Sequence, residues 1–469
     1  MSSLKNRITG NLAYLFVGEI FSNVLAFVTT IFLARKLTDE GFGLWAFVQA
    51  ILAYLIIFVD LGLPTFGTRE IAKSPDKADF FVINIFLIRS LLAVIIFTAV
   101  ALTVFIAGLS HELTLLLVLS ALWIFSQALN PEFAFQGLER MGGVAAWRIL
   151  WRVFYLVPII IFIKGRTDLW LVAIFYSASG ILAVLLLAPF LKMSFSQNWW
   201  KSVNLKTWLK YIKVSLIMAA SVVVIKVYYT FDTFMLGLLD SAKAVGWYQA
   251  AYKIIALFVG LAGLVQIAFA PYFSTHEKND AKLKAGFRYI CAIGAFIGGL
   301  ITVALFVMAG ELINMLYGVQ YAPSANILMF LSFTVYLIFL HLTYLSSMNY
   351  IGLHKEYLKV VIAGAITNII LNAILIPLIS TRGAALAAVF ANLVILIVSI
   401  FIIKKKAMLE FFVIKMMVKS SLVLAAVLYL QNFLTTNFIL KTGLACFCYG
   451  LFFALLSMSE LKYFGLKKN

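Results

Sequence analysis

The stretch from Leu312 to Leu353 reads LINMLYGVQYAPSANILMFLSFTVYLIFLHLTYLSSMNYIGL and contains no Asp, Glu, Lys or Arg. About 20 predominantly apolar residues are enough for a helix to cross the hydrocarbon core of a bilayer. Other charge-free runs of that order occur along the chain, including Ser90–Ser110, Tyr289–Gly310 and Val360–Thr381. Because a transmembrane helix satisfies its own backbone polar groups, this series predicts an all-α polytopic membrane protein.

The composition of the whole chain supports the same class. Of its 469 residues, 64% are hydrophobic and only 12% are charged, and the mean hydropathy is +1.04. Soluble domains carry about 25% charged residues. We expect about fourteen transmembrane helices, with spans near 11–34, 42–63, 81–107, 113–136, 144–164, 168–191, 211–237, 244–269, 286–309, 324–350, 357–379, 383–403, 411–430 and 436–457.

Basic residues are distributed unevenly between the connections. With the N-terminus in the cytoplasm, the inner segments hold 25 of the 37 Lys and Arg residues and the outer segments hold seven; the remaining five lie within spans. An excess of Lys and Arg on the cytoplasmic side is the usual bias of membrane proteins. It predicts that both termini are cytoplasmic, and it explains the net charge of +18 without a nucleic-acid partner.

An internal repeat is indicated at an offset of 202 residues. Six spans separate the two related stretches, which predicts two six-helix lobes related as parallel repeats. We therefore divide the chain into an N-terminal lobe (1–191), a basic interfacial linker on the cytoplasmic side (192–213), a C-terminal lobe (211–404), and two extra transmembrane helices with a cytoplasmic tail (405–469). The matching pairs are Phe32 and Phe234, Leu33 and Met235, Leu37 and Leu239, Trp45 and Trp247, and Ile57 and Val259.

Nine ionisable residues lie within predicted spans, where a charge is costly and usually faces a cavity or a partner. Lys226 and Lys253 lie deep in spans 7 and 8, and neither has an acidic residue three or four positions away. An unpaired cation at that depth attracts an anionic group. The candidate substrate pathway comprises eight of the nine: Lys226, Lys253, Arg152, Arg89, Arg148, Glu19, Asp60 and Asp232.

Each candidate also has a structural alternative. Asp60, Glu132 and Arg148 lie close to the predicted inner surface and could simply be interfacial. Glu19 could form a structural ion pair with Arg89 or Arg152. The remaining acid, Asp232, could cap the outer end of span 7. If the halves meet along spans 1, 2, 7 and 8, five of the charges approach one central cavity: Glu19, Asp60, Lys226, Asp232 and Lys253.

The sequence lacks the motifs of several enzyme classes. It contains no P-loop, no H-E-x-x-H and no G-x-S-x-G. The three cysteines, Cys291, Cys446 and Cys448, lie in apolar stretches, so we expect neither a disulfide framework nor a zinc site. We expect no cofactor, no metal and no enzymatic activity. A membrane glycosyltransferase or polymerase would need a sizeable loop with an acidic site, and no connection here exceeds about twenty residues.

Three motifs near the N-terminus resemble those of a known family. They are IFLARKLTDEGFGLW at Ile31–Trp45, DLGL at Asp60–Leu63 and TREIA at Thr68–Ala72. The chain therefore resembles the polysaccharide-biosynthesis membrane proteins, the O-antigen and capsule-unit flippases of the MOP superfamily. The resemblance is clearest over residues 11–73 and at Asp232–Ala270. It implies a V-shaped, MATE-like pair of six-helix lobes in the bacterial inner membrane.

The same resemblance implies a function. By alternating access, proteins of this family carry an undecaprenyl-pyrophosphate-linked oligosaccharide from the cytoplasmic to the outer leaflet. A coupling ion, H⁺ or Na⁺, and contact with a polymerase are further possible partners. Buried cations would then neutralise the pyrophosphate, although Glu19, Asp60 and Asp232 make the predicted cavity mixed in charge. Two alternatives keep the fold and change the cargo: a cation-coupled multidrug exporter, with Glu19 or Asp60 as the coupling acid, and a flippase for the peptidoglycan precursor.

Overall fold

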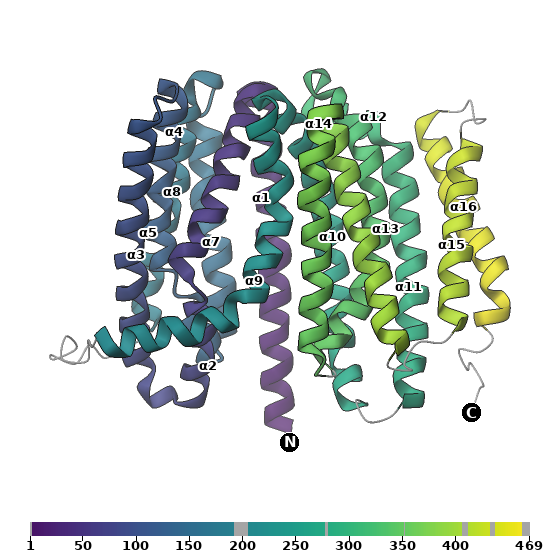
Figure 1. Ribbon diagram of the computed structural model, residues 1–469, viewed down its shortest axis with the longest axis horizontal. Helices are drawn as coiled ribbons and strands as arrows, with labels where there is room; N and C mark the ends of the chain where they lie inside the picture. Colours follow the sequence, from purple (N-terminus) through teal and green to yellow (C-terminus); the bar gives the residue numbers. More distant parts are fainter. Residues whose placement is uncertain are drawn as a thin grey trace. The chain divides into compact units, whose positions relative to one another are not determined.

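The computed structural model describes residues 2–191, 205–276, 280–350, 352–405, 411–431 and 437–461, and every regular element in these ranges is a helix (Figure 1). Contacts divide the chain into two compact units, Met1–Thr230 and Phe231–Asn469. The division falls within a single helix, α9 (Leu205–Leu239). The predicted arrangement of two lobes, a linker and two extra helices remains a prediction.

Unit 1 consists of the following helices and the first part of α9: α1 (Ser2–Asp60), α2 (Leu63–Lys73), η1 (Pro75–Lys77), α3 (Ala78–Ile106), α4 (His111–Ala121), α5 (Trp123–Ala128), α6 (Glu132–Gly137), α7 (Met141–Phe162), η2 (Arg166–Asp168), α8 (Leu169–Leu187) and η3 (Ala188–Leu191). Unit 2 contains the rest of α9 with α10 (Ala242–Thr275), α11 (Asp280–Val307), α12 (Ala309–Tyr317), η5 (Val319–Tyr321), α13 (Pro323–Tyr350), α14 (His354–Lys405), α15 (Phe411–Leu430) and α16 (Phe438–Leu461).

The fourteen predicted spans lie largely in helix, although the span 113–136 is divided among α4, α5 and α6, with breaks at Leu122 and before Glu132. Two of the observed helices contain two predicted spans each, and each is interrupted where the sequence places an outer turn. In α1 the break is at Thr38, which has φ 66° and ψ 172°, and in α14 it is at Ile379 and Ser380. Within the described residues, ten helical stretches are long and apolar enough to cross a membrane, among them Tyr14–Asp60 with 47 residues and His354–Lys404 with 51. The total of fourteen crossings remains a prediction.

The surfaces of both units fit a lipid environment. Large apolar side chains are exposed on helices of each unit, with Phe105 on α3 86% exposed and Phe401 on α14 70% exposed. Soluble proteins rarely expose so many apolar side chains, whereas a bilayer is their natural surrounding. Together with the ten apolar helices, this establishes a multi-pass membrane protein.

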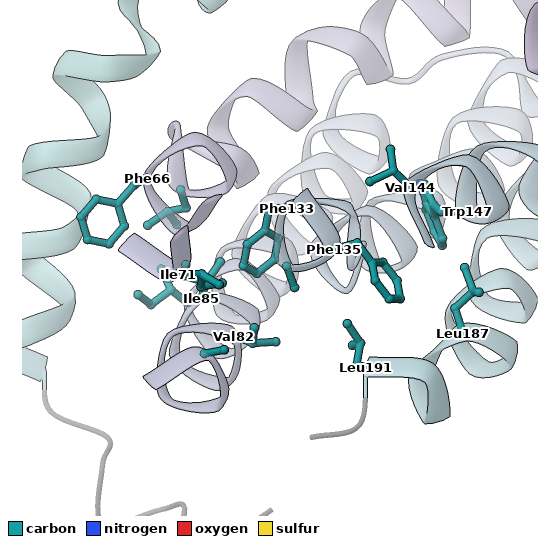
Figure 2. Packing of buried hydrophobic residues seen from close by; sticks show 14 of the residues in the cluster. Phe66, Ile71, Val82, Ile85, Phe133, Phe135, Val144, Trp147, Leu187 and Leu191 are labelled. Carbon is teal, nitrogen blue, oxygen red and sulfur yellow. The ribbon is translucent and has the colours of Figure 1, made fainter. Parts of the chain in front are cut away.

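The core of unit 1 lies where α2, α3, α6, α7 and α8 meet. Phe66 and Ile71 of α2, Phe133 of α6 and Trp147 of α7 belong to one buried apolar cluster that extends across these helices (Figure 2). The first turns of α9 pack on the same cluster through Trp208 and three neighbouring residues. The indole N–H of Trp208 donates to Oδ1 of Asn84 at 2.7 Å. The predicted linker 192–213 is therefore attached to unit 1 at its end; residues 192–204 lie outside the described ranges.

Unit 2 is built around α13, which contacts α10, α11 and α14. The last two helices attach to this bundle through buried polar contacts. Tyr449 of α16 donates its hydroxyl hydrogen bond to the carbonyl of Ala295 on α11 at 2.8 Å. On α13, the hydroxyl of Tyr336 lies 3.0 Å from Oγ of Ser421 on α15. The extra helices are therefore packed members of unit 2.

Each unit has a polar contact between two turns that the sequence analysis places on the outer side; the internal repeat itself remains a prediction. In unit 1, Arg166, just before the sixth predicted span, pairs with Glu40, just after the first, at 2.8 Å. In unit 2, Ser380 of the break in α14 donates to Asp240 at the end of α9. Thr38, where α1 breaks, and Asp240 are 202 residues apart, which equals the predicted repeat offset.

Candidate functional site

Two adjoining polar pockets lie inside unit 1. One has a volume of about 510 Å³ and includes Asp60 and Arg89 in its lining; the other has about 280 Å³ and includes Glu19 and Arg152. The two pockets share three lining residues, Gln127, Asn130 and Glu132. Helices α1, α3, α5, α6 and α7 each contribute residues to this polar region. Five of the predicted site residues lie in or beside it: Glu19, Asp60, Arg89, Arg148 and Arg152.

The larger pocket contains an ion pair between α1 and α3. Nη2 of Arg89 lies 2.7 Å from Oδ1 of Asp60, and the same nitrogen donates to the carbonyl of Gln127. The Arg89 side chain is only 3% exposed, whereas that of Asp60 is 30% exposed. Nε and Nη1 of Arg89 have no hydrogen-bond partner in the described part of the chain. This guanidinium is therefore buried and depends on one carboxylate for its charge compensation.

In the smaller pocket, Arg148 of α7 binds two carboxylates. Its Nη1 pairs with Glu19 of α1, and its Nε donates to Oε1 of Glu132 at 3.1 Å. Glu19 also accepts a hydrogen bond from Asn23, at 3.2 Å. The pairing expected for Glu19, with Arg89 or Arg152, is therefore wrong: the carboxylate reaches Arg148 because α1 crosses α7 closely at Gly18, where an added Cβ would lie 2.6 Å from Cβ of Ala145.

Arg152 differs from the other arginines of this region. It lies one turn beyond Arg148 on α7, with its guanidinium carbon 4.2 Å from the centre of the Trp151 ring. Within the described residues it forms no ion pair with a carboxylate, and its Nε has no hydrogen-bond partner. At about 1.5 Å per residue, Arg152 lies about 16 Å along α7 from Met141, well inside the predicted span. Of the two arginines that line this pocket, Arg152 is the one to which no described carboxylate is bound.

Lys226 lies on α9 within unit 1 and is half-buried. At the next residue α9 contacts α1, since the hydroxyl of Tyr54 donates to the carbonyl of Val227 at 3.5 Å. The charge of Asp60 acts favourably on the Lys226 ammonium and that of Arg89 unfavourably.

In unit 2, Asp232 is surrounded by neutral hydrogen-bond donors. It is 5% exposed. Its Oδ2 accepts from the hydroxyl of Tyr248 on α10 at 2.6 Å, and its Oδ1 accepts from the amides of Asn368 and Asn372 on α14 at 2.8 and 2.6 Å. Asp232 lies two turns before the end of α9, so its interpretation as a helix cap is wrong. No cationic side chain pairs with it in the described part of unit 2.

The last predicted residue, Lys253, is half-buried on α10 in unit 2. The structure places Lys226 and Lys253 in different units. That they line one central cavity, together with Glu19, Asp60 and Asp232, therefore remains a prediction.

Several residues of these sites were not singled out by the sequence analysis. Asn130, Gln127 and Trp151 line the pockets of unit 1, and Asn368 and Asn372 bind Asp232. One local signal was available: Asn368 and Asn372 are four residues apart in an otherwise apolar span, so they lie on one face of the helix. An uncharged amide does not carry the cost that marks an embedded charge in a sequence, so this signal is weaker.

The arrangement is suited to binding. Unit 1 presents carboxylates that are already paired with arginines, one additional guanidinium and several amides. Such groups can hold an anionic or polar ligand inside an apolar bundle. Unit 2 presents one buried carboxylate, whose charge a proton or a small cation could neutralise.

Comparison with known proteins identifies the family. A family model described as polysaccharide biosynthesis protein matches residues 8–277. The chain is 27% identical over 405 residues to a putative O-antigen transporter of Escherichia coli, covering 82% of this chain and 94% of the relative. It is 22% identical to a probable low-salt glycan biosynthesis flippase, Agl15, of Haloferax volcanii, over 80% of this chain and 78% of the relative.

Solved structures share the fold. The lipid II flippase MurJ in an inward closed conformation matches with a TM-score of 0.72 over 95% of this chain and 99% of its own, at 16% identity. An inward-facing multidrug resistance MATE family transporter of the MOP superfamily matches with a TM-score of 0.63 over 82% of this chain and 94% of its own, at 14% identity. With the family model covering more than half of its length, the chain belongs to the polysaccharide biosynthesis protein family of membrane proteins.

Proposed function

We propose that this protein is a flippase that moves lipid-linked oligosaccharide units, carried on undecaprenyl pyrophosphate, from the cytoplasmic to the outer leaflet of the bacterial inner membrane. The family and the nearly full-length similarity to a putative O-antigen transporter support this cargo. The fold, shared with MurJ and MATE transporters, supports alternating access. The distribution of Lys and Arg supports cytoplasmic termini.

The observation that carries the proposal is Arg152. A guanidinium with no carboxylate partner in the described part of the chain, placed beside a polar pocket within a membrane span, is costly unless it has an anionic ligand for part of its working cycle. The pyrophosphate or an acidic sugar of the cargo would supply that charge. The lipid tail would remain in the bilayer, because moving only the polar part through the protein avoids exposing the hydrocarbon to water.

We also propose that flipping is coupled to H⁺ or Na⁺ at Asp232. A buried carboxylate that is compensated only by neutral donors gains most from a bound proton or small cation. The two asparagine amides can also present oxygen atoms to a cation by rotating about the side-chain amide. Contact with a polymerase or with other assembly proteins remains a prediction.

Deletion of the gene tests the function. In a strain that has no paralogue, we expect lipid-linked repeat units to accumulate on the cytoplasmic side and surface polysaccharide to be lost, both restored by the wild-type gene. Purified protein in proteoliposomes should bring a labelled lipid-linked oligosaccharide to the opposite leaflet. Normal surface polysaccharide in the deletion strain would sink the proposal. A multidrug exporter would instead show drug-stimulated H⁺ or Na⁺ antiport in the same vesicles.

The contribution of the two deep lysines is tested separately. Lys226→Ala and Lys253→Ala should each slow flipping if their ammonium groups contact the cargo, and the double variant should slow it further. Lys73, which pairs with Glu70 on the exposed part of α2, supplies a control as Lys73→Ala. Full activity of the double variant would remove both lysines from the pathway.

A further inference from the structure

We propose that the first turns of α9 form a docking surface for anionic phospholipids, in the leaflet that the sequence analysis places on the cytoplasmic side. The surface consists of a row of three lysines, Lys206, Lys210 and Lys213, with Leu209 and Leu216 beside it. It is separate from the pockets of the candidate site, and the inference does not depend on which cargo the protein moves.

One face of these turns is held against unit 1. Trp208, Tyr211 and Ile212 pack on the buried cluster of unit 1, and the ring centre of Tyr211 lies 4.9 Å from that of Phe66 on α2. The indole N–H of Trp208 also donates to Asn84 on α3. Figure 1 shows this part of α9 running across the direction of α3 and α5, near the end of the unit where α2 lies. These contacts fix the rotation of the helix, so its opposite face points away from the unit.

That opposite face carries the row of lysines. Lys206, Lys210 and Lys213 are all exposed. At about 100° and about 1.5 Å per residue, the three side chains leave the helix within a sector of about 60° and form a row about 10 Å long. Within the described part of the chain, neither Lys210 nor Lys213 forms an ion pair with a carboxylate. The row is therefore a local concentration of positive charge.

The surrounding chain supplies little negative charge to this row. From Leu169 to Phe231 the sequence contains six lysines and no Asp or Glu. On the adjoining helix α2, the carboxylate of Glu70 is already bound by Arg69 at 3.5 Å and by Lys73 at 3.0 Å. Like charges one turn apart on a helix destabilise it. The row would therefore be stabilised by an anionic partner from outside the chain.

The two leucines indicate which kind of anion this is. Leu209 is 61% exposed and Leu216 is 48% exposed. In a regular helix both point to the same side of the lysine row, about 60–80° from the direction of Lys206. A helix with a basic face and an adjacent apolar face lies in the membrane interface, with its lysines among the headgroups and its apolar side chains against the acyl chains. A free phosphate or an acidic soluble protein would leave the leucines in water, whereas a phospholipid covers both.

A lipid bound here would act on a helix that both units share. The division between the units falls within α9, beyond the lysine row. The helix also packs closely on the turn that follows Asp60, since a Cβ added to Gly62 would lie 2.6 Å from Cβ of Ala219. Binding of an anionic lipid should therefore stabilise the folded protein.

Lipid titration of the purified full-length protein in detergent tests the inference. The probes are phosphatidylglycerol, phosphatidylcholine and inorganic phosphate, with bound lipid measured by native mass spectrometry and stability by the apparent melting temperature. We expect saturable binding of phosphatidylglycerol, at least about tenfold tighter than that of phosphatidylcholine. Phosphatidylglycerol should raise the melting temperature, and inorganic phosphate should not, because it has no acyl chains to cover the leucines.

Matched variants assign the binding to this surface. Replacement of all three lysines by Gln should weaken the binding of phosphatidylglycerol at least about tenfold and remove its effect on the melting temperature. Replacement of the same three by Arg keeps the charge and should preserve both. Leu209→Gln should weaken binding several-fold. The control is Lys164→Gln, Lys243→Gln and Lys441→Gln together, an equal loss of charge in connections predicted to face outward, which should bind as the wild type does.

Several results would overturn the inference. Equal binding of phosphatidylglycerol and phosphatidylcholine by the wild type would show that the lysine row does not select anionic lipid, and would leave it to an acidic protein surface. Unchanged binding in the triple Gln variant would place the lipid elsewhere. An equal loss in the outward control would mean that only net charge matters. If the triple Gln variant fails to fold, Lys210→Gln with Lys213→Gln must weaken binding several-fold for the inference to stand.

Discussion

Arg89 and Asp60 form an ion pair of 2.7 Å in which one partner is far more buried than the other, with 3% of the arginine side chain exposed against 30% of the aspartate. The two are 29 residues apart and join α3 to the end of α1. Removing one partner of a buried pair costs about 3–5 kcal/mol, because a charge remains without compensation. The unequal burial makes that cost unequal for the two partners.

The first prediction follows from this asymmetry. Asp60→Asn leaves a buried guanidinium unpaired and should lower the apparent melting temperature more than Arg89→Met, which leaves a partly exposed carboxylate. The double variant should recover part of the loss, with a coupling energy of about 1–3 kcal/mol in a double-mutant cycle. Thermal unfolding in detergent measures all four proteins. Additive losses would mean that the ion pair contributes nothing to stability.

Arg148 supplies the second prediction. Because Arg148 binds both Glu19 and Glu132, loss of one carboxylate leaves it paired with the other. Glu19→Gln or Glu132→Gln should therefore each lower the free energy of unfolding by no more than about 1 kcal/mol. Arg148→Gln leaves both carboxylates uncompensated and should cost more than the two single changes added together. Thermal unfolding again provides the measurement. A smaller effect of Arg148→Gln than of Glu132→Gln would contradict the shared pairing.

A third prediction concerns coupling at Asp232. Asp232→Asn keeps the size of the side chain and removes its charge, so flipping in proteoliposomes should no longer respond to an imposed H⁺ or Na⁺ gradient. Asp240→Asn, on the same helix and bound to Ser380, is the matched control and should keep the response. Flipping by Asp232→Asn that still follows the gradient would exclude Asp232 as the coupling group.

The fourth prediction separates backbone strain from close packing at two glycines. Gly62 has φ 78°, and a Cβ there would meet the carbonyl of Ser215 and Cβ of Ala219 on α9. Gly108 has φ 58° with nothing within 4 Å of an added Cβ. Gly108→Ala should therefore lower the free energy of unfolding by about 1–2 kcal/mol, because alanine is strained in the left-handed conformation. Gly62→Ala should cost more, because α9 would have to move. Equal changes in melting temperature would argue against tight packing of α9 on the turn between α1 and α2.

The sequence was sufficient to predict the helices, because apolar runs of membrane length leave few other structures open. It also located the embedded charges, since each interrupts such a run. It could not identify their partners. Glu19 and Arg148 are 129 residues apart, and Asp232 and Asn372 are 140 apart, so nothing local connects them. Trp151, which lines the smaller pocket, was missed for a related reason: within a membrane span, a tryptophan whose N–H has a partner and one whose N–H has none look the same in sequence.

The polar contacts between the turns that are predicted to face outward limit how each half can move. Arg166 joins the turn after the first predicted span to the turn before the sixth, and Ser380 and Asp240 make the corresponding connection in the other half. Helices joined in this way resist translation along one another, because a shift of one helical turn would break the polar contact. We therefore expect each bundle to tilt as a rigid body during transport, and we expect its helices to bend away from the ends that these contacts join.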